Sequence, residues 1–343
     1  MQTLIKFKKI IEKCFKSIFS NSSWEKLKNY IRPVLLYTGL MPDIVRDDSS
    51  YYLNCTKKFI DYIEKHKEKI DILKKNLDSE SQKEIDSFIK KIYYISTHNI
   101  LERKKIFSKA EIREQIESIN VIRKKENLYK KFNYFEYYPS ETFYGLNGIK
   151  WLPKDVIKTI QNGAILDVGA CYGDSAISFY YNIDAKNIFS FEPESNNFEK
   201  LSKNLSLINE ANIIPVKLGI SDKNGIVKIS NDTYTSVIGD DGESINVATI
   251  DSFVKENNVK KISLIKMDIE GEEMKALLGA KETIKRDMPV LSIAIYHKPE
   301  DFFEIKLWIE QNFNDYKLIV KKTNPFDPLV EVTLLAYPKF FNQ

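Results

Sequence analysis

The sequence predicts an α/β fold with a parallel sheet in its C-terminal half, preceded by a mostly helical N-terminal region. From Gly163 onward, short apolar runs alternate with segments of helical spacing, which is typical of a parallel sheet with helices on both faces. Residues 43–138 contain neither proline nor glycine, and this absence of breakers favours helices. We therefore expect a helical N-terminal region over residues 1–135, an aromatic linker or lid over residues 136–162, and an α/β domain over residues 163–343.

The apolar runs and helical segments give the order of the elements in this domain. The expected strands are residues 165–168, 188–191, 213–218, 262–267, 290–295, 316–321 and 330–337. The expected helices are residues 174–181, 196–208, 251–257, 272–285 and 300–313, with a β-rich excursion over residues 225–249. Since no helix separates the last two strands, we expect them to form an antiparallel hairpin.

The composition excludes several classes of protein. A hydrophobic content of 43% supports a full core, and a net charge of +4 is mild, so the chain is not of the disordered class. The three cysteines form no C-x-x-C pair and there are only three histidines, which fits a reducing compartment and gives no zinc or histidine-cluster signature. No apolar run approaches the ~20 residues that span a bilayer. We expect a cytoplasmic protein without a required metal.

Residues 1–20 predict a basic amphipathic helix. Lysines interrupt any apolar stretch here, so a signal peptide is not expected. The apolar face either packs on the protein itself, which is our preferred interpretation, or makes peripheral contact with an anionic membrane surface.

The strand over residues 165–168 ends on a carboxylate and a glycine turn, which predicts a nucleotide-type cofactor site. Asp167 comes just before Gly169, and Gly173 closes the turn. Glu192 ends the next strand, where its carboxylate can accept both hydroxyls of a ribose. A dinucleotide site would place a glycine at Cys171. An acidic turn repels a pyrophosphate but suits the ammonium and sulfonium of S-adenosylmethionine, so we interpret the site as a methyl-donor site.

A second motif ends the strand over residues 262–267. Asp268 and Glu270 follow that strand directly, and ligands bind outside the carboxyl ends of strands in open α/β sheets. We expect both to face the cleft beside the glycine turn. Glu272 is expected mainly to cap the helix that follows, where negative charge is favourable.

With these motifs, residues 163–338 resemble the FkbM family of S-adenosylmethionine-dependent methyltransferases. The resemblance implies a class I methyltransferase fold, whose Rossmann-like sheet ends in an antiparallel hairpin, and O-methyl transfer, often to sugars or other hydroxylated acceptors. Its most specific part is the Lys-x-Asp-x-Glu-Gly-x-Glu run. The matching segments are residues 167–170, 191–193, 219–222, 249–251, 265–272 and 295–301.

Methyl transfer to a hydroxyl requires a proton acceptor, and His297 is the first candidate. It follows the strand over residues 290–295, at the cofactor edge of the sheet, and an unperturbed histidine suits base work near neutral pH. The alternative is that it caps the next helix. Asp268 is the second candidate for the base, or an orienting acceptor. Lys266 shares its face and forms either a structural ion pair or a substrate clamp.

The remaining expectations concern ligands. Asp167, Gly169 and Gly173 are expected around the methionine portion and Glu192 at the ribose. Ser221 and Asp222 are expected at the adenine edge, unless Asp222 forms an Asx turn with residues 224–225. A Mg²⁺ site of Asp268, Glu270 and Asp251 is a minor alternative to no metal. Four aromatic residues are candidates for holding a sulfonium or a sugar ring, although such residues more often pack a junction: Tyr138, Phe143, Tyr144 and Trp151.

The leading function is an O-methyltransferase that acts on a sugar, a glycan or a related hydroxyl. A nucleic-acid methyltransferase is the alternative within this class, and only the basic residues of segment 101–131 favour it. A non-catalytic scaffold that keeps the cofactor fold is the third possibility. The intact acids and glycines argue against the scaffold.

Overall fold

The computed structural model describes residues 44–45, 51–132, 138–185, 187–209, 212–232, 235–238 and 242–339. The predicted amphipathic helix over residues 1–20, and with it the possible membrane contact, lies outside the described residues. No helix among the described ranges is long and apolar enough to cross a membrane.

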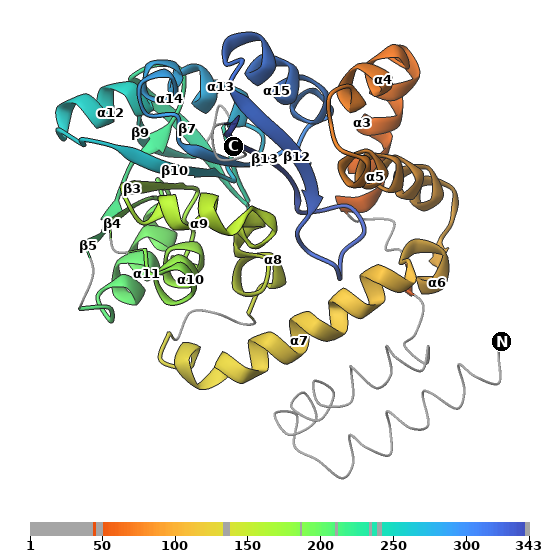
Figure 1. Ribbon diagram of the computed structural model, residues 1–343, viewed down its shortest axis with the longest axis horizontal. Helices are drawn as coiled ribbons and strands as arrows, with labels where there is room; N and C mark the ends of the chain where they lie inside the picture. Colours follow the sequence, from red (N-terminus) through yellow and green to blue (C-terminus); the bar gives the residue numbers. More distant parts are fainter. Residues whose placement is uncertain are drawn as a thin grey trace.

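A seven-stranded sheet forms the centre of the molecule (Figure 1). Its order is β12-β13-β11-β10-β3-β4-β5. The strands are β3 (Ala164–Val168), β4 (Asn187–Phe191), β5 (Asn212–Val216), β10 (Ile262–Met267), β11 (Val290–Ala294), β12 (Tyr316–Lys322) and β13 (Val332–Pro338). The strands from β11 to β5 pair in parallel, whereas β13 pairs antiparallel with both β11 and β12. The parallel sheet and the antiparallel C-terminal hairpin are as predicted.

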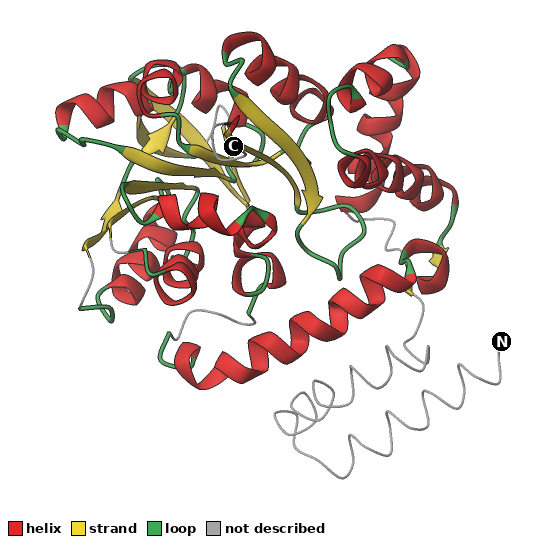
Figure 2. Cartoon of the chain, viewed as in Figure 1, coloured by secondary structure: helices red, strands yellow, loops and turns green. Residues whose placement is uncertain are grey.

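Helices cover both faces of this sheet, as Figures 1 and 2 show. One face carries α12 (Ile250–Glu256), α13 (Glu273–Leu278), α14 (Lys281–Asp287) and α15 (Pro299–Asn312). The other carries α8 (Ser140–Phe143), α9 (Lys154–Ile160), α10 (Asp174–Ile183) and α11 (Ser195–Leu205), and a 3₁₀ segment, η1 (Leu146–Trp151), joins α8 to α9. The strands β3, β10 and β11 are buried along their whole length, which explains why most of their residues are apolar.

The predicted helix over residues 272–285 is in fact two helices, α13 and α14. The break falls at Gly279, where a Cβ would lie 2.2 Å from the backbone oxygen of Ser221. The backbone oxygen of Gly279 also accepts a hydrogen bond from the backbone N–H of Asp251 at 2.9 Å. The chain turns here because its backbone packs directly against two other segments.

The β-rich excursion forms a separate four-stranded sheet in the order β6-β9-β7-β8. Its strands are β6 (Gly219–Ile220), β7 (Gly225–Asp232), β8 (Thr235–Ile238) and β9 (Glu243–Ala248).

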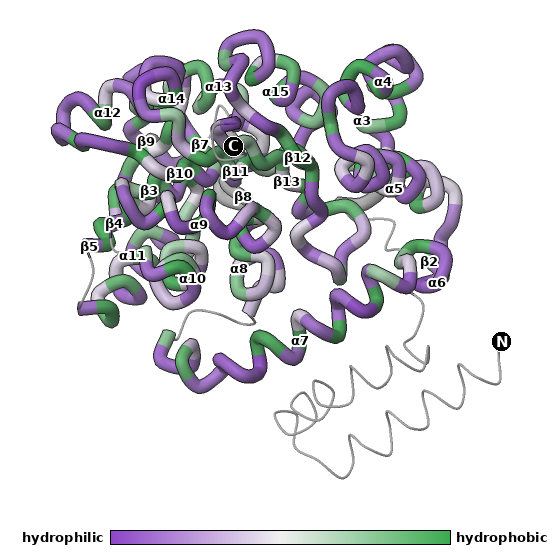
Figure 3. The backbone as a smooth tube through the Cα atoms, viewed as in Figure 1, coloured by the Kyte–Doolittle hydropathy of each residue, from purple (hydrophilic) through white to green (hydrophobic). Residues whose placement is uncertain are grey.

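The described residues before the linker are mostly helical, as the lack of breakers predicted. They form α3 (Tyr51–Lys65), α4 (Glu68–Lys74), α5 (Ser79–Thr97), α6 (Arg103–Ile106) and α7 (Lys109–Tyr129), with a short ladder of β1 (Ile44–Val45) and β2 (Ile100–Leu101). A capping box at Ser108 and Glu111 begins α7. The rings of Phe59, Phe88 and Phe302 pack edge-on or tilted at 4.8–5.8 Å between α3, α5 and α15. These helices therefore share one apolar core with the sheet, while α7 presents a mostly hydrophilic surface (Figure 3).

Candidate functional site

The glycine turn after β3 brings the two sequence motifs into contact. Gly169 has φ +78° and Gly173 has φ +87°, a left-handed backbone that glycine adopts at little cost. A Cβ on Gly169 would lie 1.9 Å from the backbone oxygen of Asp268. The backbone N–H of Asp268 donates to the oxygen of Val168 at 3.1 Å. The backbone of the turn after β3 therefore packs directly against the backbone of the segment after β10.

A buried ion pair between Lys266 and Asp167 lies next to this turn. Lys266 stands level with Asp167 on the neighbouring strand, and its Nζ lies 3.4 Å from Asp167 Oδ1. The same Nζ donates to the backbone oxygen of Gly169 at 2.7 Å. Burial raises the pKa of Asp167 to about 6, although Lys266 opposes the rise. Burial acts to lower the pKa of Lys266, but nearby aspartates outweigh it and raise that pKa. Through these contacts, Lys266 and Asp167 hold the turn in position.

Glu192 is a buried carboxylate at the end of β4, beside the glycine turn. It is only 6% exposed. Its Oε2 accepts the backbone N–H of Cys171 at 3.0 Å and its Oε1 accepts that of Glu194 at 3.0 Å. Burial raises the pKa of Glu192 to about 7, and the two backbone donors reduce the rise. A carboxylate has about four acceptor positions, so two remain for hydroxyl groups.

The predicted adenine-edge residues lie at the end of β6, in the smaller sheet. Ser221 is buried and its hydroxyl donates to Asp222 Oδ1 at 3.1 Å. Asn224, rather than Asp222, secures the loop, because its Oδ1 accepts from the backbone N–H of Thr249 and from the hydroxyl of Ser252, both at 2.9 Å.

The end of β10 and the end of β11 together form a cluster of three carboxylates around His297. The distance from His297 Nε2 is 3.4 Å to Asp268 Oδ1 and 3.6 Å to Glu270 Oε2. His297 Nδ1 lies 3.0 Å from Glu273 Oε1. Burial acts to lower the pKa of His297, but the carboxylates outweigh it and raise the pKa to about 10. At neutral pH the imidazole of the ligand-free chain therefore carries a proton, so the sequence-based argument from an unperturbed pKa fails.

Glu272 lies at the N-cap position of α13, as expected, but forms no capping hydrogen bond there. It instead pairs with Lys275 at 2.6 Å. Glu273, the first residue of α13, secures the loop before the helix, because its Oε1 accepts the backbone N–H of Ile269 at 2.8 Å. His297 does not cap α15, since its ring nitrogen contacts Glu273.

Asp251 lies away from this cluster, so the predicted magnesium trio does not form. Its carboxylate accepts the backbone N–H groups of Glu282 and Thr283 at 3.1 and 2.8 Å. Asp251 therefore secures the first turn of α14.

Sequence reasoning missed the acidic residues contributed by the linker and by α10. Thr142 donates to Asp174 Oδ2 at 3.0 Å, and Asn324 donates to Glu141 Oε2 at 2.9 Å. Burial, together with the charges of Asp174 and Asp268, raises the pKa of Glu141 to about 7. No local pattern marks Glu141, because its neighbours come from segments distant in the chain.

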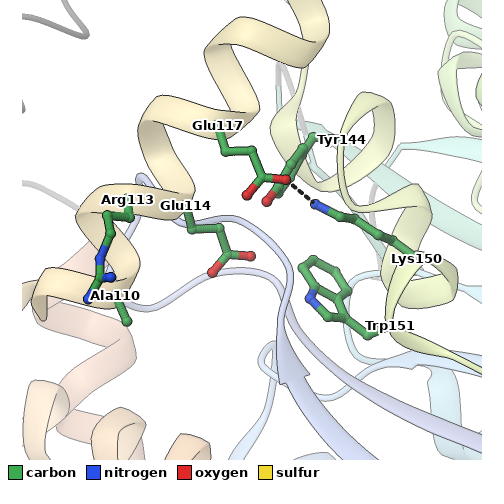
Figure 4. Close-up of a pocket in the computed structure, with 7 residues that line it drawn as sticks. All are labelled: Ala110, Arg113, Glu114, Glu117, Tyr144, Lys150 and Trp151. Carbon is green, nitrogen blue, oxygen red and sulfur yellow. Dashed lines mark hydrogen bonds and ion pairs between the residues drawn. The ribbon is translucent and has the colours of Figure 1, made fainter.

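The four aromatic candidates divide between the core and a surface hollow. Phe143 is buried against Tyr138, with ring centroids 5.6 Å apart. Tyr144 and Trp151 line a hollow of about 510 Å³ between α7 and η1 (Figure 4). Lys150 also lines it, with its Nζ 3.1 Å from the centroid of the Tyr144 ring. None of the residues around this hollow belongs to the glycine turn or to the His297 cluster.

The set of residues around the turn fits S-adenosylmethionine. The buried carboxylates of Asp167 and Glu192 and the half-buried one of Asp174 surround the turn, and one buried lysine, Lys266, balances them. An excess of negative charge favours a ligand that carries an ammonium and a sulfonium. Glu192 retains acceptor positions for the ribose.

Comparison with known proteins agrees with this assignment. Residues 167–318 match the family model described as the methyltransferase FkbM domain. A hexuronic acid methyltransferase, AglP, from Haloferax volcanii is 26% identical over 143 residues, which cover 38% of this chain and 58% of that protein. The crystal structure of a methyltransferase FkbM from Methylobacillus flagellatus KT is 20% identical with a TM-score of 0.56, and the match covers 82% of this chain and 61% of that one. The chain thus spans less than two thirds of either relative.

The strand order and the structural match confirm the predicted class I methyltransferase fold. The family match likewise confirms S-adenosylmethionine as the expected cofactor of the domain. Over residues 167–318 the chain is similar to the methyltransferases of the FkbM family.

Proposed function

We propose that the protein transfers the methyl group of S-adenosylmethionine to a hydroxyl of a sugar or glycan. The observation that carries the proposal is the meeting of two motifs at one edge of the sheet. The cofactor turn, with Gly169, touches the segment that bears Asp268, and His297 adjoins Asp268. A methyl donor and a group that accepts a proton would therefore stand side by side.

The acceptor class is supported by the named relative. The similar protein from Haloferax volcanii is a hexuronic acid methyltransferase, and hexuronic acids are sugars that carry hydroxyls. No contact favours the nucleic-acid alternative. Several basic residues of the segment 101–131 engage their own chain: Lys105 pairs with Glu102 at 2.7 Å, and Lys131 donates to the backbone oxygen of Leu207 at 3.3 Å.

When bound, S-adenosylmethionine supplies a methyl group on a positively charged sulfur that a hydroxyl oxygen can attack in line. Glu192 holds the ribose hydroxyls, and the acidic turn attracts the methionine ammonium. These contacts fix the direction of attack, which supplies much of the rate. Lys266 holds the turn through the backbone oxygen of Gly169.

Asp268 takes the proton of the attacking hydroxyl in this proposal. Its side chain is 29% exposed, so an acceptor can reach it, whereas that of His297 is 5% exposed. His297 already carries a proton at neutral pH in the ligand-free chain. It therefore positions Asp268 and Glu270, and Asp268 replaces it as the first candidate for the general base.

The first test is calorimetric titration of the full chain with S-adenosylhomocysteine, beside a Glu192→Ala variant. We expect micromolar binding that the variant loses. Transfer of a labelled methyl group is then measured with free hexuronic acids, nucleotide-linked sugars and RNA as acceptors. Label on the sugars but not on RNA supports the proposal. Label on RNA alone, or no binding by a folded chain, would refute it.

A further inference from the structure

The His297 cluster contains a ring nitrogen without a hydrogen bond. The His297 side chain is 5% exposed, yet its Nε2 has no hydrogen-bond partner. This nitrogen points between carboxylate oxygens of Asp268 and Glu270, at 3.4 and 3.6 Å. Both distances exceed a normal hydrogen bond. A buried polar atom in this state requires an explanation.

The other side of the ring is fixed. His297 Nδ1 lies 3.0 Å from Glu273 Oε1, and that oxygen is itself held by the backbone N–H of Ile269 at 2.8 Å. The Glu273 side chain is fully buried. In metal sites, a carboxylate of this kind orients a histidine so that its other nitrogen faces the ion. Glu273 therefore sets the direction of Nε2.

The distances from His297 Nε2 to the two carboxylate oxygens fit a small cation. Metal–nitrogen and metal–oxygen bonds of zinc-type ions are about 2.0–2.2 Å, which places tetrahedral ligand atoms about 3.4 Å apart. The distances from Nε2 to Asp268 and Glu270 match this spacing. A related set has Glu273 in place of Glu270: one ligand atom each from Asp268, Glu273 and His297 lies within 4.8 Å of the others.

We propose that His297 Nε2, Asp268 and Glu270 bind a first-row transition-metal dication such as Zn²⁺ or Mn²⁺, with Glu273 as the carboxylate that orients His297. The proton on Nε2 is released to solvent as the ion binds, because a ligating imidazole nitrogen must be deprotonated. An imidazole ligand suits these ions, whereas Mg²⁺ prefers oxygen ligands alone. The predicted magnesium trio contained two of these ligands, and the fold supplies a histidine in place of Asp251.

The site keeps one side open to an acceptor. The side chains of Asp268 and Glu270 are 29% and 33% exposed. A site with three protein ligands and a free position is the arrangement of catalytic zinc. An acceptor hydroxyl at that position would ionise more easily, and its proton would pass to the second oxygen of Asp268. This catalytic role rests on the proposed function, but ion binding does not.

The experiment is calorimetric titration of the chelator-treated full chain with ZnCl₂, MnCl₂ and MgCl₂, without cofactor. Variants are Glu270→Gln, which removes a ligand, and Glu273→Gln, which removes the orienting carboxylate. Glu300→Gln is the matched control, because Glu300 is an exposed carboxylate in the first turn of α15. Thermal unfolding verifies that each variant is folded.

We expect Zn²⁺ and Mn²⁺ to bind at least tenfold more tightly than Mg²⁺. Glu270→Gln and Glu273→Gln should each weaken binding about 10- to 100-fold, with Glu300→Gln within twofold of the unmodified chain. No binding by the unmodified chain, or equal affinity in Glu270→Gln, would overturn the proposal. His297 would then be a protonated bridge between carboxylates.

A parallel titration with S-adenosylhomocysteine separates this proposal from the proposed function. Cofactor binding without ion binding refutes the metal site alone. Ion binding without cofactor binding refutes the proposed function alone.

Discussion

Replacing Glu192 with glutamine tests the cofactor end of the site. The carboxylate of Glu192 should affect both the pH dependence of the free energy of unfolding and the affinity for S-adenosylhomocysteine. Burial raises the pKa of Glu192 from 4.5 to about 7 in the folded chain. In the unfolded chain the side chain is in water and titrates near 4.5. Glutamine has nearly the same shape but does not titrate, so it removes this pH dependence.

The sign follows from proton linkage. Between pH 4.5 and about 7 the folded chain retains a proton on Glu192 that the unfolded chain has released, so the free energy of unfolding falls as the pH rises. The separation of the two pKa values corresponds to ~3 kcal/mol, since one pKa unit is about 1.4 kcal/mol. The loss is complete above about pH 7, and Glu192→Gln does not show it.

Urea unfolding of both proteins between pH 5 and 8 measures this difference. Relative to the unmodified chain, Glu192→Gln should gain ~2–3 kcal/mol of unfolding free energy over that range. The contributions of other titrating groups cancel, because they are the same in the unmodified chain and in Glu192→Gln. Glu199→Gln is the control, since Glu199 is exposed on α11 and pairs with Lys203. Parallel profiles for Glu192→Gln and the unmodified chain would refute the assignment of a buried carboxyl with a raised pKa.

Cofactor affinity supplies the second readout. A hydrogen bond to a charged group contributes about 1.5–3 kcal/mol, so Glu192→Gln should weaken S-adenosylhomocysteine binding roughly 10- to 100-fold. The affinity of the unmodified chain should rise with pH and level off above about 7, as the carboxylate forms. Unchanged affinity in the variant would remove Glu192 from the ribose site.

Three further predictions concern stability, and thermal and denaturant unfolding measure each. Gly169→Ala should lose about 3 kcal/mol or more because of its φ of +78° and the backbone oxygen 1.9 Å from the added Cβ, whereas Gly225→Ala, with nothing within 4 Å, should change by less than ~0.5 kcal/mol; similar losses at both positions would contradict the packing argument. Lys266→Met should cost ~3–5 kcal/mol because the buried Asp167 loses its cation, and Lys266→Met combined with Asp167→Asn should recover part of that loss; no recovery would exclude an unpaired charge as the cause. Thr249→Ala should cost ~1 kcal/mol, since the Thr249 hydroxyl accepts the backbone N–H of Ser252 in the first turn of α12 at 3.0 Å, and no change would show that the cap is replaced by water.

The sequence by itself determined the sheet, its order of elements and the edge where the ligands would gather. Apolar periodicity is a local property, so strands such as β3 and β10 could be placed within a residue or two. The glycine turn and Glu192 were also readable, because each follows a buried strand directly and the carboxyl ends of parallel strands share an edge. The break between α13 and α14 could not be predicted from the sequence, since it depends on the contact of Gly279 with Ser221.

Tertiary structure alone decided the chemistry of the individual side chains. A histidine has the same intrinsic pKa wherever it stands in a sequence. In the fold, three carboxylates that follow β10 surround His297, which follows β11, and they raise its pKa. Asp251 and Asp268 looked equivalent as possible ligands, until the fold placed one at a helix start and the other beside His297. Charge interactions depend on separation and burial, and those quantities exist only once distant segments have packed together.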